Sequence, residues 1–184
     1  MYKAASAILD TIIYFMPRPD LNTVPEWYHG YIKLVEENNL MVAMKEQTPL
    51  LIRFFNRIPP SKRNYRYAKG KWSIKELLQH LIDAERVFAY RGLCFARKDS
   101  TSLPGFDENN YADNAKSGKR DWNEMIEELK AVRRSTELLF GSFDKDQLSF
   151  VGTANNNPVS VLAIGFIIVG HISHHITIVK ERYL

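Results

Sequence analysis

The chain has 184 residues, of which 45% are hydrophobic and 25% are charged. This size and composition fit one globular domain with a sizeable core, and they exclude a disordered chain or a fibrous repeat. The net charge of +4 comes from 25 basic and 21 acidic residues that alternate along the sequence. This charge pattern does not support nucleic-acid binding, because a phosphate-binding protein gathers its basic residues into a patch. The single cysteine, Cys94, cannot form an internal disulfide, which fits a reducing compartment.

Residues 1–15 are expected to be an N-terminal extension, followed by one domain over residues 16–184. The extension is a poor signal peptide, because Asp10 interrupts its apolar run and no small-residue cleavage site follows. It is either an amphipathic appendage or a start-site artefact ahead of Met16. No later stretch reaches the roughly 20 apolar residues that span a bilayer, since histidines interrupt the run from Val159. We therefore expect a cytoplasmic protein that has no membrane partner.

The first of four longer predicted helices covers about residues 39–57. Apolar side chains recur there at spacings of three and four, as on one buried helical face. Pro49 lies inside this range, so either the helix is kinked or a shorter helix begins near Thr48. A short helical turn that opens at Pro25 is expected before it.

The second predicted helix has the clearest start. Ser73 is a helix N-cap residue and Glu76 follows three residues later, which is the pattern of a capping box. Trp72 is interpreted as the residue that packs on Leu77 in a hydrophobic staple. The helix should end near Arg97.

The third helix is predicted to begin at Asp121, with Glu124 in the reciprocal capping position, and to end at Gly141. The fourth is predicted to begin at Asn157 and Pro158, a cap followed by a proline in the first turn, and to continue to the C-terminus. No segment alternates convincingly between polar and apolar residues, so we predict an all-α fold.

A long connection over about residues 98–120 separates the second helix from the third. Its residues are typical of turns, and it can carry the chain diagonally across the bundle. The predicted architecture is therefore a four-helix bundle with a long crossover connection, not a simple up-down-up-down bundle. Asn110 and Tyr111 in this connection either line the mouth of a site or are ordinary turn residues.

The histidines are the most chemically informative residues. In the fourth helix His171 and His175 lie four residues apart on the apolar stripe, so both project inward from successive turns. His174 competes with His175 for this role, but His175 continues the stripe more closely. His80 lies on the inward face of the second helix. His29 has no apolar neighbours at helical spacing and is expected at the surface. The residues that share the face of His80 are Leu77, Ala84, Val87 and Arg91.

Three neutral imidazoles suit zinc, nickel, copper or iron and leave a coordination position for water or substrate. A site made from His80, His171 and His175 would therefore support chemistry, since structural zinc sites are normally closed by four ligands. The alternative is that these are hydrogen-bonded core histidines. No catalytic residue beyond the predicted ligands is identified.

Three charged residues follow His80 within two turns, namely Asp83, Glu85 and Arg86. One of them orients a ligand ring or a bound water, or the three residues form a solvated face or an ion pair. Cys94 is interpreted as a small buried apolar residue.

Four segments resemble a known family. They are residues 71–86, 103–107, 152–155 and 170–175, which read KWSIKELLQHLIDAER, LPGFD, GTAN and GHISHH. They are similar to the DinB superfamily, in particular to its branch related to the YfiT metal-dependent hydrolases, and the likeness extends from about Met16 to the C-terminus. The resemblance implies a four-helix bundle of unusual helix order. It also implies a divalent metal, usually zinc or nickel, whose ligands correspond here to His80, His171 and His175.

Characterised relatives include thiol S-transferases that use bacillithiol, mycothiol or glutathione, and a mycothiol-dependent maleylpyruvate isomerase. The resemblance therefore implies a metal-dependent thiol S-transferase or hydrolase, which activates a thiol or water and acts on a small molecule, with a low-molecular-weight thiol as a cosubstrate. One alternative is a non-catalytic metal-binding or stress-associated bundle, and another is an interaction module with buried histidines and no metal. Bundles of this type often pair through a helix face, so a homodimer is also an expectation.

Overall fold

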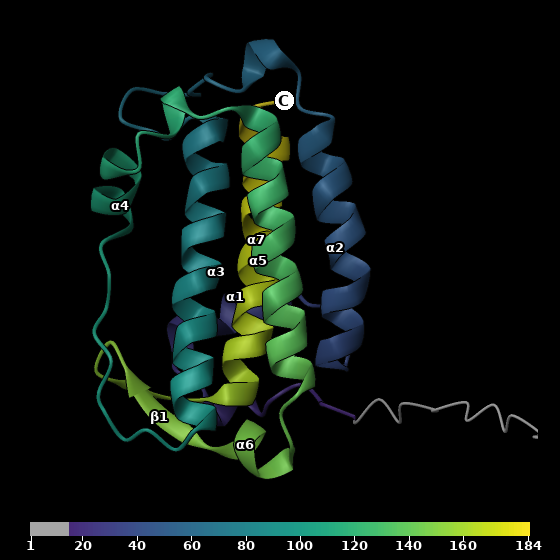
Figure 1. Cartoon of the computed structure of the whole chain (residues 1–184), viewed down its shortest axis with the longest axis vertical. Coiled ribbons are helices and arrows are strands. Elements are labelled where there is room, and N and C mark those ends of the chain that lie inside the picture. Colours follow the sequence, from purple (N-terminus) through teal and green to yellow (C-terminus); the bar gives the residue numbers. More distant parts are fainter. Residues whose placement is uncertain (1–14) are drawn as a thin grey trace, which may run out of the picture.

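The computed structural model describes residues 15–184 and shows a bundle of four long helices (Figure 1). Helices α2 and α3 each pack against both α5 and α7, so the order around the bundle is α2, α5, α3, α7. Helices α2 and α7 run in one direction, and α3 and α5 run in the other (Figure 1). The prediction of an all-α four-helix bundle is confirmed. The four helices are α2 (Leu40–Asn56), α3 (Ile74–Ala96), α5 (Trp122–Gly141) and α7 (Val161–Arg182).

The long crossover connects two neighbours. It leaves α3, runs back along the outside of the bundle through α4 (Glu108–Asn114) and enters α5, which is parallel to α3 (Figure 1). The bundle is therefore not up-down-up-down, as predicted. The expectation of a diagonal crossover is wrong, because the diagonal connections are those from α2 to α3 and from α5 to α7.

The remaining elements are short. The helical turn expected at Pro25 is present as a 3-10 turn that leads directly into α1. The short helices are η1 (Leu21–Thr23), η2 (Glu26–Tyr28), α1 (His29–Lys33), η3 (Pro60–Lys62), η4 (Ser117–Lys119) and α6 (Lys145–Ser149).

The helix ends follow the capping residues of the sequence. Asn39 accepts backbone N–H bonds at the start of α2, and the helix then runs through Pro49, so the shorter alternative from Thr48 is wrong. At the start of α3 the Ser73 backbone N–H donates to Glu76 Oε2 at 2.6 Å, and Glu76 N–H donates to Ser73 Oγ at 3.3 Å. This reciprocal pair is the predicted capping box.

A β-hairpin precedes α7. Strands β1 (Val151–Ala154) and β2 (Asn157–Ser160) pair antiparallel. The two residues between them, Asn155 and Asn156, have φ angles of 51° and 62°. This left-handed pair makes the tight turn typical of two-residue hairpins, and asparagine tolerates it better than most residues.

The hairpin corrects two expectations. Asn157 and Pro158 lie in β2, so the prediction that they begin the last helix is wrong. The N-cap of α7 is Ser160, whose side chain accepts from the N–H of Ala163. The expectation that no strand is present is also wrong. The sequence did not show the two strands because each spans only four residues, which is too few to show a period of two.

The crossover is more ordered than a series of turns. Asp107 accepts N–H bonds from Asn109 and Asn110 and thereby caps α4, so the interpretation of this stretch as turns alone is wrong. Nearer α3, the Leu103 N–H donates to Thr153 O at 2.9 Å and ties the crossover to strand β1. This contact holds the crossover against the hairpin at one end of the bundle.

Helix α7 packs against α1, α2, α3 and α6. Within residues 15–184 it is the one helix with the length and composition of a membrane span, which corrects the expectation that its histidines rule this out. Most of its apolar stretch is buried inside the bundle, and a core helix of a globular protein has the same composition. Packing between neighbouring helices therefore accounts for its hydrophobicity.

Candidate metal centre

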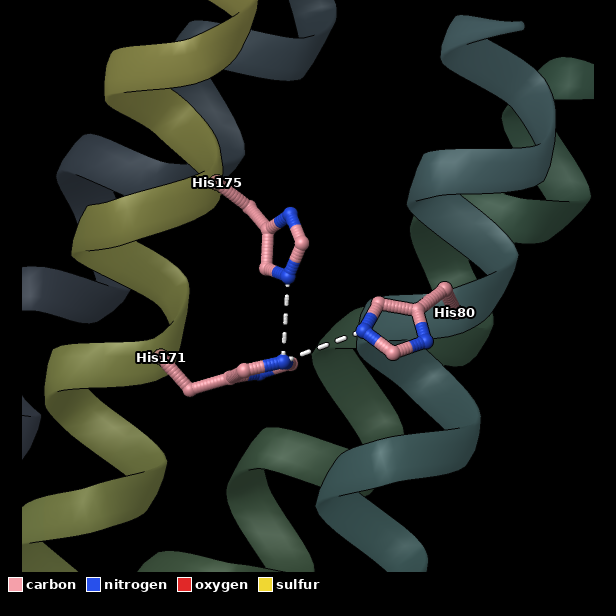
Figure 2. A group of neighbouring side chains, drawn as sticks. All are labelled: His80, His171 and His175. Carbon is pink, nitrogen blue, oxygen red and sulfur yellow. Dashed lines mark hydrogen bonds between the residues drawn. The ribbon is translucent and has the colours of Figure 1, made fainter. Parts of the chain in front are cut away.

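Three histidine side chains from two helices converge on one point (Figure 2). The Nε2 atom of His171 lies 3.0 Å from Nε2 of His80 and 3.1 Å from Nε2 of His175. His80 comes from the second turn of α3, and the other two come from successive turns of α7, which packs against α3. The structure thus brings together the three predicted ligands.

His174 and His29 lie outside this cluster. The ring of His174 faces Tyr31, with centroids 5.3 Å apart, although it is the neighbour of His175 in the chain. His29 is half-buried, so it is less exposed than expected, and its Nε2 lies 2.8 Å from Val24 O. The choice of His175 over His174 therefore agrees with the geometry.

Close packing of α1 on α7 places an aromatic ring beside the cluster. A Cβ atom on Gly170 would lie only 2.0 Å from Tyr31 O, so a residue with a side chain cannot occupy this position without moving α1. This close packing of α1 on α7 places the Tyr31 ring edge-on to the His171 ring, with centroids 5.5 Å apart.

The other side of the cluster is closed by Trp72. Its ring lies 4.7 Å from the His80 ring between centroids, and its carbonyl accepts a hydrogen bond of 2.7 Å from the Tyr183 hydroxyl. The last turn of the chain therefore helps to hold the indole next to a predicted ligand. The sequence interpretation assigned Trp72 to a hydrophobic staple with Leu77, whereas the structure makes it a wall of the site.

Burial keeps the three imidazoles neutral. It lowers the pKa of His80 to about 4 and that of His175 to about 3, and it lowers the pKa of His171 as well. The neighbouring rings lower the values of His171 and His175 further, because a second positive charge nearby disfavours protonation. All three rings therefore carry a free lone pair at neutral pH.

The arrangement fits a divalent cation better than a set of hydrogen bonds. A neutral imidazole nitrogen has one proton or one lone pair, so His171 Nε2 cannot form two well-aligned bonds to both neighbours. A tetrahedral zinc ion with bonds of about 2.0–2.1 Å places its ligand nitrogens roughly 3.3 Å apart. The two separations from His171 are close to this, at 3.0 and 3.1 Å, and the ligand atoms of all three residues lie within 4.8 Å of one another. The donor set also suits zinc and nickel, because imidazole is a preferred ligand of both.

The sequence profile of the DinB superfamily matches residues 43–179, which is most of the chain. The chain belongs to the DinB superfamily. Among solved structures it is similar to YfiT from Bacillus subtilis, with 15% sequence identity, a TM-score of 0.66, and coverage of 90% of this chain and 91% of that one. YfiT is described as a probable metal-dependent hydrolase with an unusual four-helix bundle topology. At this identity the likeness establishes the shared fold. No curated protein matches the chain.

In this DinB-superfamily protein the three histidines line a pocket of about 380 Å³. Its walls come from η2 and α1, from α3, from the crossover and from α7. Gly105 of the crossover packs tightly on Asn155 of the hairpin turn, since a Cβ atom there would lie 2.5 Å from the Asn155 amide oxygen. The aromatic residues of the lining are Trp27, Tyr28, Tyr31, Trp72, Phe88 and Phe106.

The charged residues after His80 act away from the three-histidine cluster. Glu85 forms a buried ion pair with Arg133, Asp83 accepts a bond from Gln79, and Arg86 pairs with Glu128. The ion-pair alternative therefore agrees with the structure for Glu85 and Arg86, and the solvated-face alternative is wrong for Glu85, which is 2% exposed. Within residues 15–184 none of their hydrogen bonds or ion pairs reaches a ring of the three-histidine cluster.

Some lining residues were not predicted. Asn110 and Tyr111 line a separate groove outside the pocket of the three histidines, and the crossover instead contributes Phe106 and Glu108 to that pocket. Tyr31 had no signal in the sequence, because α1 reaches the site only through tertiary packing. Asn155 ends the GTAN segment that resembles the DinB superfamily, but the sequence predicted no role for it at the site. Arg91 did have a signal in the sequence, since it shares the inward face of His80, but no role was assigned to it.

Proposed function

We propose that the protein is a metal-dependent enzyme, either a hydrolase or a thiol S-transferase, in which His80, His171 and His175 hold a divalent ion, zinc or nickel. The observation that carries this proposal is the convergence of three neutral imidazole nitrogens on the wall of a pocket large enough for a small molecule. Membership of the DinB superfamily supports it, as does the description of YfiT as a probable metal-dependent hydrolase.

A divalent cation held by three imidazoles lowers the pKa of a coordinated water or thiol and supplies a nucleophile at neutral pH. The chain's own residues shape the pocket around it. The aromatic walls exclude bulk water and bind apolar parts of a substrate. Burial and the nearby charge of Glu108 raise the pKa of Tyr31, so its hydroxyl keeps its proton and can donate a hydrogen bond to a substrate. Glu108, exposed at the pocket rim, can accept a proton.

The first test is the metal content of the purified protein. We expect about one zinc or nickel ion per chain by elemental mass spectrometry, and its loss in His80→Ala. His174→Ala is the matched control, because this residue neighbours His175 but faces Tyr31. A His80→Ala protein that binds the metal with unchanged affinity would contradict the proposal.

The second test is turnover. The metal-loaded protein is mixed with a chromogenic electrophile and with glutathione, bacillithiol or coenzyme A, and separately with chromogenic esters that require only water. Thiol-dependent product indicates a transferase, and ester cleavage indicates a hydrolase. Stoichiometric metal without turnover, together with a large loss of stability on chelation, would favour the non-catalytic metal-binding bundle. A cytoplasmic location and a homodimer remain predictions.

A further inference from the structure

Arg91 is a buried cation in the wall of the metal pocket. The residue is only 4% exposed, and its Nη2 donates a hydrogen bond of 2.7 Å to Pro104 O in the crossover. Its guanidinium also interacts with the Tyr28 side chain. None of the ion pairs within residues 15–184 includes Arg91.

A buried guanidinium without a carboxylate is costly. Transfer of a charge from water into a protein interior costs several kcal/mol unless an opposite charge or several hydrogen bonds compensate it. The lowered pKa of Arg91, caused by desolvation, reflects this cost. Glu108 lines the same pocket but forms no ion pair with Arg91.

Arg91 differs from the other deeply buried arginine, Arg133. Arg133 has a carboxylate partner in Glu85, while two of its nitrogens are shut off from solvent without a hydrogen-bond partner. No nitrogen of Arg91 is in that state in the described part of the chain, so each one either has a partner or borders open space. Because Arg91 lines the metal pocket and the adjoining groove, a ligand can reach it.

The guanidinium belongs to a residue that lines the same pocket as the three histidines. Its Cζ is 5.8 Å from the centroid of the Phe88 ring, and the same ring is 5.9 Å from that of His171. The guanidinium is therefore separated from the three-histidine cluster by no more than these two distances together. Because Arg91 and the three histidines line one pocket, a small molecule bound there can extend from the guanidinium to the cluster.

We propose that Arg91 binds the carboxylate of an organic acid whose reacting group lies at the three-histidine centre. The planar fork of a guanidinium matches a carboxylate with two parallel hydrogen bonds, and the aromatic walls suit an apolar body between the two ends. This inference rests on the proposed function and adds a substrate class to it. The carboxylate belongs either to the molecule that is attacked or to the thiol cosubstrate.

The competing explanation is that Arg91 only fastens the crossover through Pro104. Loss of that role would lower stability, but it would not make the pocket distinguish an acid from its neutral amide. The test therefore compares benzoate with benzamide, which have nearly the same shape, by calorimetric or NMR titration of the purified protein. Each titration is repeated after chelation, because a metal also binds carboxylates.

In the wild-type protein we expect benzoate to bind more tightly than benzamide, with and without metal. Arg91→Met should weaken benzoate binding by about 10-fold or more, as expected for hydrogen bonds to a charged group, and leave benzamide unchanged. Arg91→Lys keeps the charge but loses the fork, so it should be intermediate, and it carries the test if Arg91→Met does not fold. Arg97→Met, at the exposed end of α3, is the control.

Unchanged benzoate affinity in Arg91→Met, or no preference for benzoate in the wild-type protein, overturns the proposal. Metal content is measured in every variant, which separates the two ideas. If the wild-type protein never holds metal but Arg91→Met loses benzoate binding, the Arg91 site is sustained and the metal-dependent enzyme is refuted. If the wild-type protein holds metal and Arg91→Met binds benzoate as tightly as the wild-type protein does, the metal centre is sustained and the Arg91 site is refuted.

Glutathione and its dimethyl ester distinguish the source of the carboxylate. If the thiol supplies it, Arg91→Met should weaken glutathione binding by about 10-fold and leave binding of the ester unchanged. If the attacked substrate supplies it, glutathione should bind equally to the variant and the wild-type protein.

Discussion

Helix α3 carries a buried polar residue on each of two faces, and the two surroundings differ. His80 faces α7 and meets two more histidines. Glu85, five residues later and therefore about 140° further around the helix, meets Arg133 of α5. The first group is neutral, and each of its rings has one nitrogen lone pair, whereas the second group brings opposite charges together.

The ion pair is sealed, whereas the histidine cluster is open. Arg133 Nη2 lies 3.0 Å from Glu85 Oε2, and the two side chains are 0% and 1% exposed. Gln47 adds a contact of 3.4 Å from α2. Burial raises the pKa of Glu85, and the charge of Arg133 opposes this rise. The comparison teaches that a buried charge can be neutralised within the protein by an opposite charge, whereas a neutral cluster of acceptors beside a pocket can bind a cation from outside.

The largest expected effect is the loss of metal affinity when the histidine cluster, and not the ion pair, is changed. His171→Ala removes the ring that contacts both other histidines. Loss of an outer partner of a ligand costs about 10–100-fold in affinity, so loss of this ligand should exceed roughly 100-fold and abolish turnover. Titration with a metal indicator measures it, and His174→Ala should keep its metal. Equimolar metal in dialysed His171→Ala would show that the cluster is not the binding site.

The second effect concerns the ion pair and stability. Arg133→Met leaves the Glu85 carboxylate buried without a counter-charge, which should cost about 3–5 kcal/mol. Chemical denaturation measures this, and the metal content should not change. The double variant Glu85→Leu with Arg133→Met should recover much of the loss, because it removes both charges. A loss below about 1 kcal/mol would mean that the pair lies in a wetter region than the structure shows.

The third effect is a pH dependence that belongs to the histidine region. Folding lowers the pKa of His80 from 6.5 to about 4 and that of His175 from 6.5 to about 3. The unfolded chain therefore binds more protons below pH 6.5, and the free energy of unfolding of the metal-free protein should fall as pH drops from 6.5 towards 4.

Thermal or chemical denaturation of the chelated protein across this pH range measures the third effect. His175→Ala should show a shallower fall, since one of the neutral buried rings is missing. His29→Ala, outside the cluster, serves as the control and should follow the wild-type protein. Equal slopes in His175→Ala and the wild-type protein would contradict the assignment.

The smallest effect lies in the helix that both regions share. Ser73→Ala removes the N-cap of α3 and should lower stability by about 1 kcal/mol, without loss of metal or of the ion pair. Ser142→Ala, at the exposed end of α5, should change stability by less than about 0.5 kcal/mol. If Ser73→Ala lost its metal while its stability changed little, the start of α3 would contribute directly to metal binding.

Local features of the fold could be predicted because their causes are local. Asn39, Ser73 and Asp121 cap helices where the sequence indicates a start. The spacing of His171 and His175 put both on the inward face of one helix. The hairpin could not be found in this way, because its strands are short and Asn157 and Pro158 also resemble a helix start.

The sequence by itself determined the four long helices, their buried faces and the pairing of two histidines on one of them, since each depends on residues a few positions apart. Tertiary structure decided the parallel arrangement of α3 and α5 and the surroundings of Arg91. It also brought Tyr31 and Trp72 to the histidines. These features depend on contacts between distant segments, and such contacts form only where close packing and the pairing of buried polar groups are satisfied together.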